Sequence, residues 1–168
     1  MVAMRKQQPP HKSFNARRSL RLPDFDYRQP YIYHIIMGTH RRKPILSRKE
    51  LTRELIDLLV EEAKRVDVRV YAYCFMPDHV HILIRPEGAA DVVSFVQRYK
   101  SLSTRIYWKH GKGKLWQRSF YDHILRKGED VRQLARYILE NPVRKGLIDD
   151  YLTYPFSGSL VFDPKDLS

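Results

Sequence analysis

Two histidines, His79 and His81, are the residues in this chain whose type and spacing point most directly to chemistry. Side chains alternate along a strand, so the two imidazoles share one face, while Val80 and Ile82 point to the opposite, apolar face. Neutral imidazole is the commonest metal ligand among protein side chains, and two such ligands leave coordination positions open for a substrate oxygen. The pair therefore indicates a metal site. A hydrogen-bonded polar pair on a strand would give the same pattern.

A second polar pair, Tyr137 and Asn141, lies on the last predicted helix. This helix begins near Asp130 and ends by Asn141, because Pro142 disfavours helical geometry in the residue before it. Tyr137 lies roughly 120° from the centre of the apolar stripe, on its flank, and Asn141 follows one turn later on the same face. A phenol and an amide so placed can face one site. They can also be a solvated flank residue and a C-terminal cap.

The chain carries a large positive charge that is concentrated in two segments. Its 168 residues include 31 Lys and Arg against 19 Asp and Glu, for a formal net charge of +12. The first 22 residues contain no acidic residue, and basic residues between Arg98 and Lys145 are interleaved with aromatic ones. This mixture favours a polyanionic partner such as nucleic acid, although a charged surface can also serve solubility.

Length and composition indicate one globular domain. We expect a basic amino-terminal arm over residues 1–28, the domain over residues 29–159 and a tail over residues 160–168. The single cysteine, Cys74, excludes an internal disulfide and suits a reducing cytoplasm. There is no apolar run of membrane-spanning length and no apolar segment typical of a signal peptide, so a cytoplasmic protein with no membrane partner is expected.

The hydrophobic periodicity predicts the order strand, helix, strand, strand, helix, strand, helix. Ser47 with Glu50 three residues later matches a capping box for the first helix, and Asp91 can cap the second. This order predicts an α+β fold, in which a ferredoxin-like or RRM-like antiparallel sheet is backed by helices. The expected strands cover residues 31–39, 68–75, 79–85 and 116–125, and the expected helices begin near residues 47, 91 and 130.

Such a sheet is also typical of small RNA-binding modules, which stack bases on exposed aromatic side chains. Tyr71, Tyr73 and Phe75 are the candidates for that role. The histidines and Tyr137 would then have no function. No glycine-aromatic signature of these modules is found in the chain, but the alternative stays open at this point.

Together these motifs resemble those of the single-tyrosine HUH transposases, and in particular the REP-associated tyrosine transposases. The family's strand motif, Met-Pro-x-His-hydrophobic-His, matches residues 76–81. Its helix motif, Tyr-Ile-x-x-Asn-Pro-x-Arg-x-Gly-Leu, matches residues 137–147, and its Trp-Gln-Arg segment matches residues 116–118. Asp78 stands where asparagine is common in the family.

The resemblance implies an HUH endonuclease fold of the IS200-like transposase family and a metal-dependent single-stranded DNA endonuclease and strand transferase. His79, His81 and Asn141 would bind Mg²⁺ or Mn²⁺, and Tyr137 would form a 5′-phosphotyrosine intermediate at hairpin-bearing, REP-like DNA. A relative that binds such hairpins without cleaving them is the alternative. A homodimer and a monomer are both compatible with these motifs, and the expected location is the cytoplasm, in association with the nucleoid.

The expected DNA contacts lie in the amino-terminal arm, in and around the Trp-Gln-Arg segment, and along the final helix. The arm would reach a groove of the hairpin stem, and the other residues would bind phosphates or stack on bases. The residues are Arg17, Arg18, Arg21, Lys114, Trp116, Gln117, Arg118, Arg126, Arg136 and Arg144.

Overall fold

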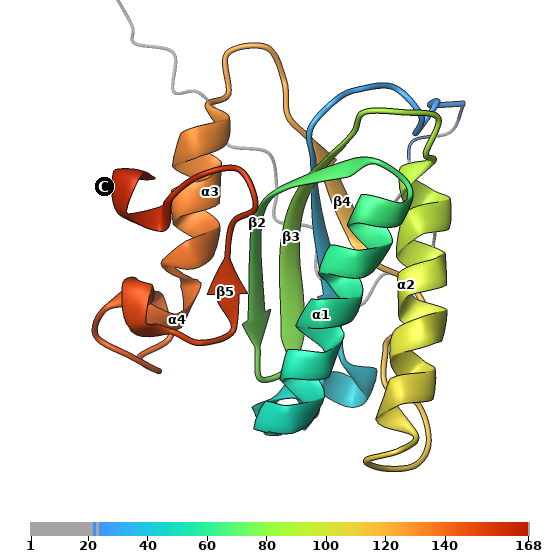
Figure 1. Ribbon diagram of the computed structural model, residues 1–168, viewed down its shortest axis with the longest axis vertical. Helices are drawn as coiled ribbons and strands as arrows, with labels where there is room; N and C mark the ends of the chain where they lie inside the picture. The colour runs from blue at the N-terminus through green and yellow to red at the C-terminus, as the bar shows by residue number, and fades with distance from the viewer. Residues whose placement is uncertain (1–21, 23, 168) are drawn as a thin grey trace, which may run out of the picture.

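A five-stranded antiparallel sheet lies at the centre of the molecule (Figure 1). The computed structural model describes residue 22 and residues 24–167. The strand order is β4-β1-β3-β2-β5, and every neighbouring pair is antiparallel, which confirms the predicted α+β class. The strands are β1 (Tyr33–Gly38), β2 (Val68–Met76), β3 (His79–Pro86), β4 (Tyr121–Ile124) and β5 (Ser157–Gly158).

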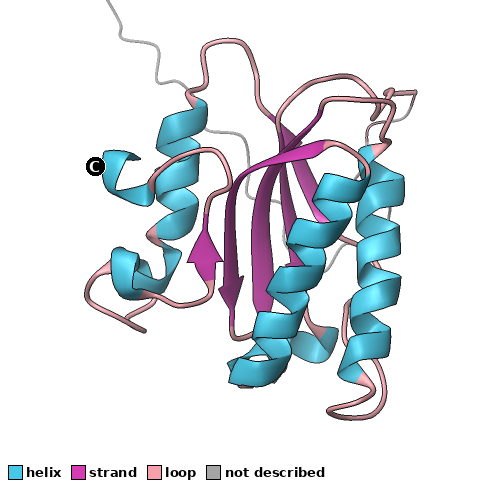
Figure 2. Cartoon of the chain, in the orientation of Figure 1, coloured by secondary structure: helices cyan, strands magenta, loops and turns pink. Residues whose placement is uncertain are grey.

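Helices cover both faces of the sheet, as Figure 2 shows. α1 (Lys49–Arg65) and α2 (Val92–Tyr107) pack on one face and enclose the larger hydrophobic core. α3 (Val131–Leu139) packs on the other face over β2 and encloses a second, smaller core; the short α4 (Asn141–Arg144) follows it. None of the helices within the described residues is long and apolar enough to cross a membrane.

The helix starts agree with the sequence pattern in two cases and differ in one. The Asp91 side chain accepts a hydrogen bond from the Ser94 amide (2.8 Å), as predicted for the start of α2, and Asp130 caps α3 in the same way. The predicted capping box at Ser47 is wrong. Ser47 ends a 3₁₀ turn in which its amide donates to the Pro44 carbonyl (3.2 Å), so α1 begins only at Lys49.

The fourth strand is shorter than the predicted span of residues 116–125. Trp116 forms only an isolated bridge with Thr39, and its ring is buried, with Nε1 donating to Oγ of Ser103 (2.8 Å). The aromatic residues of this segment therefore serve core packing, and only Tyr121–Ile124 pairs as a strand. β5 was not predicted, because a strand of two residues is too short to show an alternation of apolar and polar side chains.

Residues at both ends of the expected domain pack onto it. Tyr27, which we assigned to the arm, is buried, and its hydroxyl donates to Asp122 (2.8 Å). At the other end, the tail lies along α3 (Figure 1), and the Leu167 side chain is buried there. The folded part therefore extends beyond residues 29–159 on both sides.

Candidate active site

His79 and His81 lie at the beginning of β3, directly after the turn that joins it to β2. Both side chains are buried, with 8% and 7% of their surface exposed, and their Nε2 atoms lie 3.1 Å apart. Val80 and Ile82 belong to the core on the opposite face of the sheet, so the predicted alternation is confirmed. The two imidazoles therefore share one face and face each other; we call them the histidine pair.

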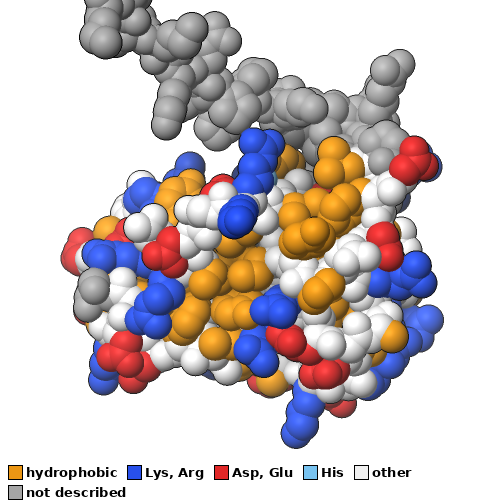
Figure 3. Space-filling model, turned by 90° about the horizontal axis from the view of Figure 1, so that it is seen from above, with side chains coloured by type: hydrophobic (Ala, Val, Ile, Leu, Met, Phe, Trp, Pro, Cys, Tyr) orange, Lys and Arg blue, Asp and Glu red, His pale blue; other side chains and the backbone are white. Residues whose placement is uncertain are grey.

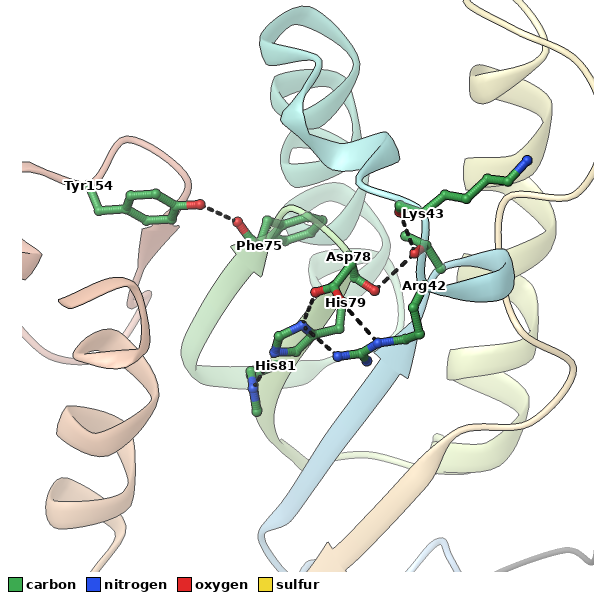
Figure 4. Close-up of polar contacts among 8 residues, drawn as sticks. Arg42, Lys43, Phe75, Asp78, His79, His81 and Tyr154 are labelled. Carbon is green, nitrogen blue, oxygen red and sulfur yellow. Dashed lines mark hydrogen bonds and ion pairs between the residues drawn. The ribbon is translucent and has the colours of Figure 1, made fainter. Parts of the chain in front are cut away.

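The second nitrogen of each imidazole is held by another side chain. Nδ1 of His79 lies 2.6 Å from Oδ1 of Asp78, whose Oδ2 lies 3.1 Å from Nε of Arg42 (Figure 4). Nδ1 of His81 lies 2.9 Å from Nε2 of His34 on β1. Our sequence analysis missed His34 and Arg42. The sequence places His34 in a predicted strand, but it does not show which residue of another strand lies beside it.

Burial favours the neutral form of both imidazoles in the histidine pair. Burial lowers the pKa of His79, against the opposing effect of the Asp78 hydrogen bond, and burial lowers the pKa of His81 well below its usual range. Burial also lowers the pKa of His34 to about 4. Because only the unprotonated nitrogen of a neutral imidazole binds a metal ion, the burial of the pair favours ligation.

The last helix lies beside the histidine pair. Cys74 and Met76 of β2 are the direct cross-strand partners of His81 and His79, and such partners share a face of the sheet. Both pack in one cluster with the apolar face of α3. β3 begins at the lower end of the sheet in Figure 1, where α3 also ends and α4 follows. The fold therefore brings the two predicted site segments to the same end of the sheet.

Tyr137 and Asn141 differ strongly in exposure. Tyr137 is 51% exposed, in agreement with its predicted place on the flank of α3, and the Arg144 guanidinium lies over its ring. Asn141 is 6% exposed. An amide oxygen is a hydrogen-bond acceptor that can also serve as a metal ligand.

The donor atoms present here fit a divalent metal ion. Two nitrogens that each lie about 2.1 Å from one ion are about 3.0 Å apart when they subtend a right angle, close to the observed separation. No set of three or more His, Cys, Asp and Glu side chains in the described part of the chain could hold a metal, so a third protein ligand would be of another type. The Asn141 amide meets that requirement. Imidazole with oxygen ligands does not by itself select Mg²⁺ over Mn²⁺ or Zn²⁺.

Of the expected DNA contacts, those around the Trp-Gln-Arg segment are near the site. Lys114 and Arg118 are exposed and line a groove at the end of α2, which also contains Lys100 and Trp108; we call it the α2 groove. Gln117 borders the histidine pair, because its side chain lies against Gly38, the cross-strand partner of His79.

The tryptophan that faces solvent is not the one we predicted. Trp116 is buried in the core, where its ring is not available for stacking on a base, whereas Trp108 is 59% exposed. The sequence does not distinguish the two, because both tryptophans lie in one basic, aromatic stretch.

The remaining expected contacts are dispersed. Arg126 follows β4, whose last residue pairs with the start of β1, so it lies at the end of the sheet away from the histidine pair. Lys and Arg side chains at that upper end are mixed with Asp and Glu (Figure 3). Arg136 forms an ion pair with Glu140 (2.7 Å). Arg17, Arg18 and Arg21 lie outside the described residues.

The comparison with protein families decides the assignment. A family model described as "Transposase IS200 like" matches residues 28–141. The chain belongs to the IS200-like transposase family. The predicted family and the predicted class of enzyme, a transposase, are thereby confirmed.

Relatives of this IS200-like transposase include two with curated names. A REP-associated tyrosine transposase of Escherichia coli K12 is 25% identical over 139 residues, which cover 79% of this chain and 81% of the relative. The ISDra2 transposase TnpA of Deinococcus radiodurans is 30% identical over 113 residues, which cover 63% of this chain and 80% of the relative. A solved REP-associated tyrosine transposase bound to a REP hairpin has the same fold, with a TM-score of 0.65, 22% identity and 78% coverage of both chains.

The alternative of an RNA-binding module loses its structural basis. Two of the three aromatic side chains proposed to stack on bases are buried, with Phe75 at 0% and Tyr71 at 6% exposure. α1 and α2 cover the face on which Phe75 lies, and α3 covers the β2 side of the other face, where Tyr71 lies.

Proposed function

We propose that this IS200-like transposase cleaves and rejoins single-stranded DNA at REP-like hairpins. In this proposal Tyr137 is the nucleophile, and His79, His81 and Asn141 bind Mg²⁺ or Mn²⁺. The observation that carries it is the separation of 3.1 Å between the two Nε2 atoms, beside the end of the helix that bears the tyrosine. A bound divalent ion polarises the scissile phosphate and offsets its charge.

The reacting group that the protein supplies is the hydroxyl of Tyr137. A free tyrosine titrates near pH 10, so the hydroxyl must lose its proton as it attacks. The Arg144 guanidinium carbon, 3.8 Å from the centroid of the Tyr137 ring, supplies positive charge to a developing phenolate. The phenolic oxygen bonds to phosphorus, the bond to the 3′ oxygen breaks, and that oxygen takes up a proton. The 5′-phosphotyrosine link conserves the energy of the bond for rejoining.

Two features support DNA as the substrate. The α2 groove combines Lys114 and Arg118 with the exposed Trp108, a combination that suits a phosphate backbone and a stacked base. A relative of the same fold is bound to a REP hairpin. Hairpin DNA is therefore the partner that we propose for this chain.

The test is the formation of a covalent adduct. The protein is incubated with hairpin-bearing single-stranded DNA and Mg²⁺ or Mn²⁺, denatured, and analysed by gel electrophoresis. We expect an adduct with the wild type and none with Tyr137→Phe, which keeps the ring but lacks the nucleophilic oxygen. An adduct with Tyr137→Phe would exclude this nucleophile, and tight hairpin binding without any cleavage would favour a binding-only protein.

A further inference from the structure

Each imidazole of the histidine pair is engaged on the side that faces away from the other imidazole. His34 holds Nδ1 of His81, and Asp78 holds Nδ1 of His79, at 2.9 and 2.6 Å. The atoms that remain are the two Nε2 atoms, which face each other. The surroundings of the pair thus distinguish the two nitrogens of each ring.

On the His79 side, the hydrogen-bond direction follows from the chemistry of the partner. Nδ1 of His79 has two neighbours, Oδ1 of Asp78 at 2.6 Å and Nη2 of Arg42 at 3.4 Å. An ionised carboxylate only accepts hydrogen bonds, so the nearer contact makes Nδ1 the donor, and Nδ1 carries the hydrogen. In a neutral ring, this leaves a lone pair on Nε2. Arg42 holds the other carboxylate oxygen of Asp78 at 3.1 Å and so fixes the carboxylate in turn.

The turn that carries Arg42 is strained. Arg41 and Arg42 have φ values of 55° and 54°, in the left-handed region that costs a residue with a side chain on the order of 1 kcal/mol. Two consecutive residues of this kind persist only where the surrounding structure enforces them. The contact from Arg42 to Asp78 is one such constraint, and it links the turn to the histidine pair.

On the His81 side, the partner is a third imidazole. Ile36 is the cross-strand partner of His81, so His34 lies two residues along β1 on the same face. His34 is 7% exposed, and its ring stacks on that of His81 with centroids 5.2 Å apart. When Nδ1 of His81 donates to Nε2 of His34, Nε2 of His81 also carries a lone pair.

We propose that His34 and Asp78 are positioning residues, one behind each imidazole, which hold His81 and His79 in the orientation and tautomer that let both Nε2 atoms bind one metal ion. The inference rests on the proposed function, since it takes the histidine pair as metal ligands. Partners of this kind typically contribute about 10- to 100-fold to metal affinity.

The first measurement is the affinity for Mn²⁺ of the full chain, by isothermal titration calorimetry. His34→Leu and Asp78→Ala remove the partners, whereas His34→Gln and Asp78→Asn keep a polar atom close to the same place. We expect about 10- to 100-fold weaker binding for the first two variants and recovery to within about threefold of the wild type for the conservative ones. His110→Gln is the matched control, because His110 bonds to Glu54 of α1 and not to the histidine pair.

The second measurement reports the positioning without any metal. Nitrogen-15 NMR of the imidazoles in the metal-free protein distinguishes the two tautomers of each ring. Asp78→Ala should change the tautomer populations of His79, and His34→Leu should change those of His81. Thermal unfolding checks that each variant folds; should His34→Leu not fold, His34→Asn, whose amide is too short to reach His81, replaces it.

The outcomes separate this inference from the proposed function. Mn²⁺ binding that requires His79 and His81 but is unchanged in His34→Leu and Asp78→Ala overturns the positioning role alone. Mn²⁺ that does not bind the wild type, or that binds His79→Ala and His81→Ala as tightly as the wild type, overturns the ligand assignment and the inference with it. Loss in the non-polar variants with recovery in the conservative ones supports both.

Discussion

The guanidinium carbon of Arg144 lies 3.8 Å from the centroid of the Tyr137 ring. Nη2 of the same arginine donates to the Tyr137 backbone carbonyl at 2.6 Å, which ties α4 to the last turn of α3. The charge also reaches the histidine pair: burial is the main cause of the lowered pKa of His81, and Arg144 adds to it. One arginine therefore connects the proposed nucleophile with the proposed metal ligands.

Replacing Arg144 with leucine should slow adduct formation about tenfold, because a cation over an aromatic face and a developing phenolate contributes on the order of 1 kcal/mol. The measurement is the single-turnover rate of adduct formation at saturating Mn²⁺ and DNA. Arg132→Leu is the control, since Arg132 lies on α3 but stacks on the Phe162 ring and not on Tyr137. Equal losses in both variants would contradict a specific role for Arg144.

A mixture of two inactive variants tests whether the site lies within one chain. The apolar face of α3 packs on Cys74 and Met76, the strand partners of the histidine pair in the same chain. Tyr137→Phe mixed with His81→Ala should therefore form no adduct. Each variant alone is the control. An adduct that appears in the mixture and grows with protein concentration would indicate a dimer that exchanges its tyrosine helices.

Acidification should destabilise the fold through His34. Its pKa is about 4 in the folded state and about 6.5 in the unfolded chain, so the unfolded state binds the proton first as the pH falls. The stability contributed by the neutral form is complete above about pH 6.5 and is lost as the pH falls towards 4, on the order of 3 kcal/mol. Urea unfolding across this range measures it, and His34→Leu should show a shallower pH dependence.

The exposed tryptophan should contribute to DNA binding and the buried one to stability. Trp108→Ala should weaken binding to single-stranded DNA about tenfold or more, since stacking on one base contributes about 1–3 kcal/mol. Trp116→Phe should keep the affinity but lose about 1 kcal/mol of stability with its bond to Ser103. Fluorescence anisotropy and urea unfolding measure the two effects. If Trp116→Phe weakened DNA binding and Trp108→Ala did not, the DNA-binding surface would not be the α2 groove.

Glu62 should matter for stability and not for the reaction. Its carboxylate is buried and bonds to Arg65 (3.0 Å) and Arg98 (2.7 Å), which links α1 to α2. Burial raises the pKa of Glu62, but the two arginines outweigh it and lower that pKa overall. Glu62→Gln should therefore lower the free energy of unfolding by about 1–2 kcal/mol at pH 7, with unchanged Mn²⁺ affinity. An unchanged urea midpoint would show that the link contributes nothing.

Features that depend on neighbouring residues alone were predictable from the sequence. The shared face of His79 and His81 follows from the alternation of a strand, and the exposure of Tyr137 follows from the period of a helix. The cap at Asp91 is equally local. The order of strands and helices also followed from such periods, which is why the fold class was confirmed.

Pairings across the sheet were not predictable. His34 and His81 are 47 residues apart, and only the register of β1 against β3 brings their rings together. The burial of Trp116 and the exposure of Trp108 depend likewise on how α2 packs. Our prediction chose Trp116, which is buried, because both tryptophans lie in one basic, aromatic stretch.

The sequence by itself determined the residues of the histidine pair, the tyrosine helix and the family to which they point, because local backbone geometry sets which side chains share a face. The tertiary structure decided that α3 lies beside the pair, that His34 bonds to His81, and that Arg42 fixes the Asp78 carboxylate. These relationships arise from the packing of segments distant in the chain, and no local period contains that information.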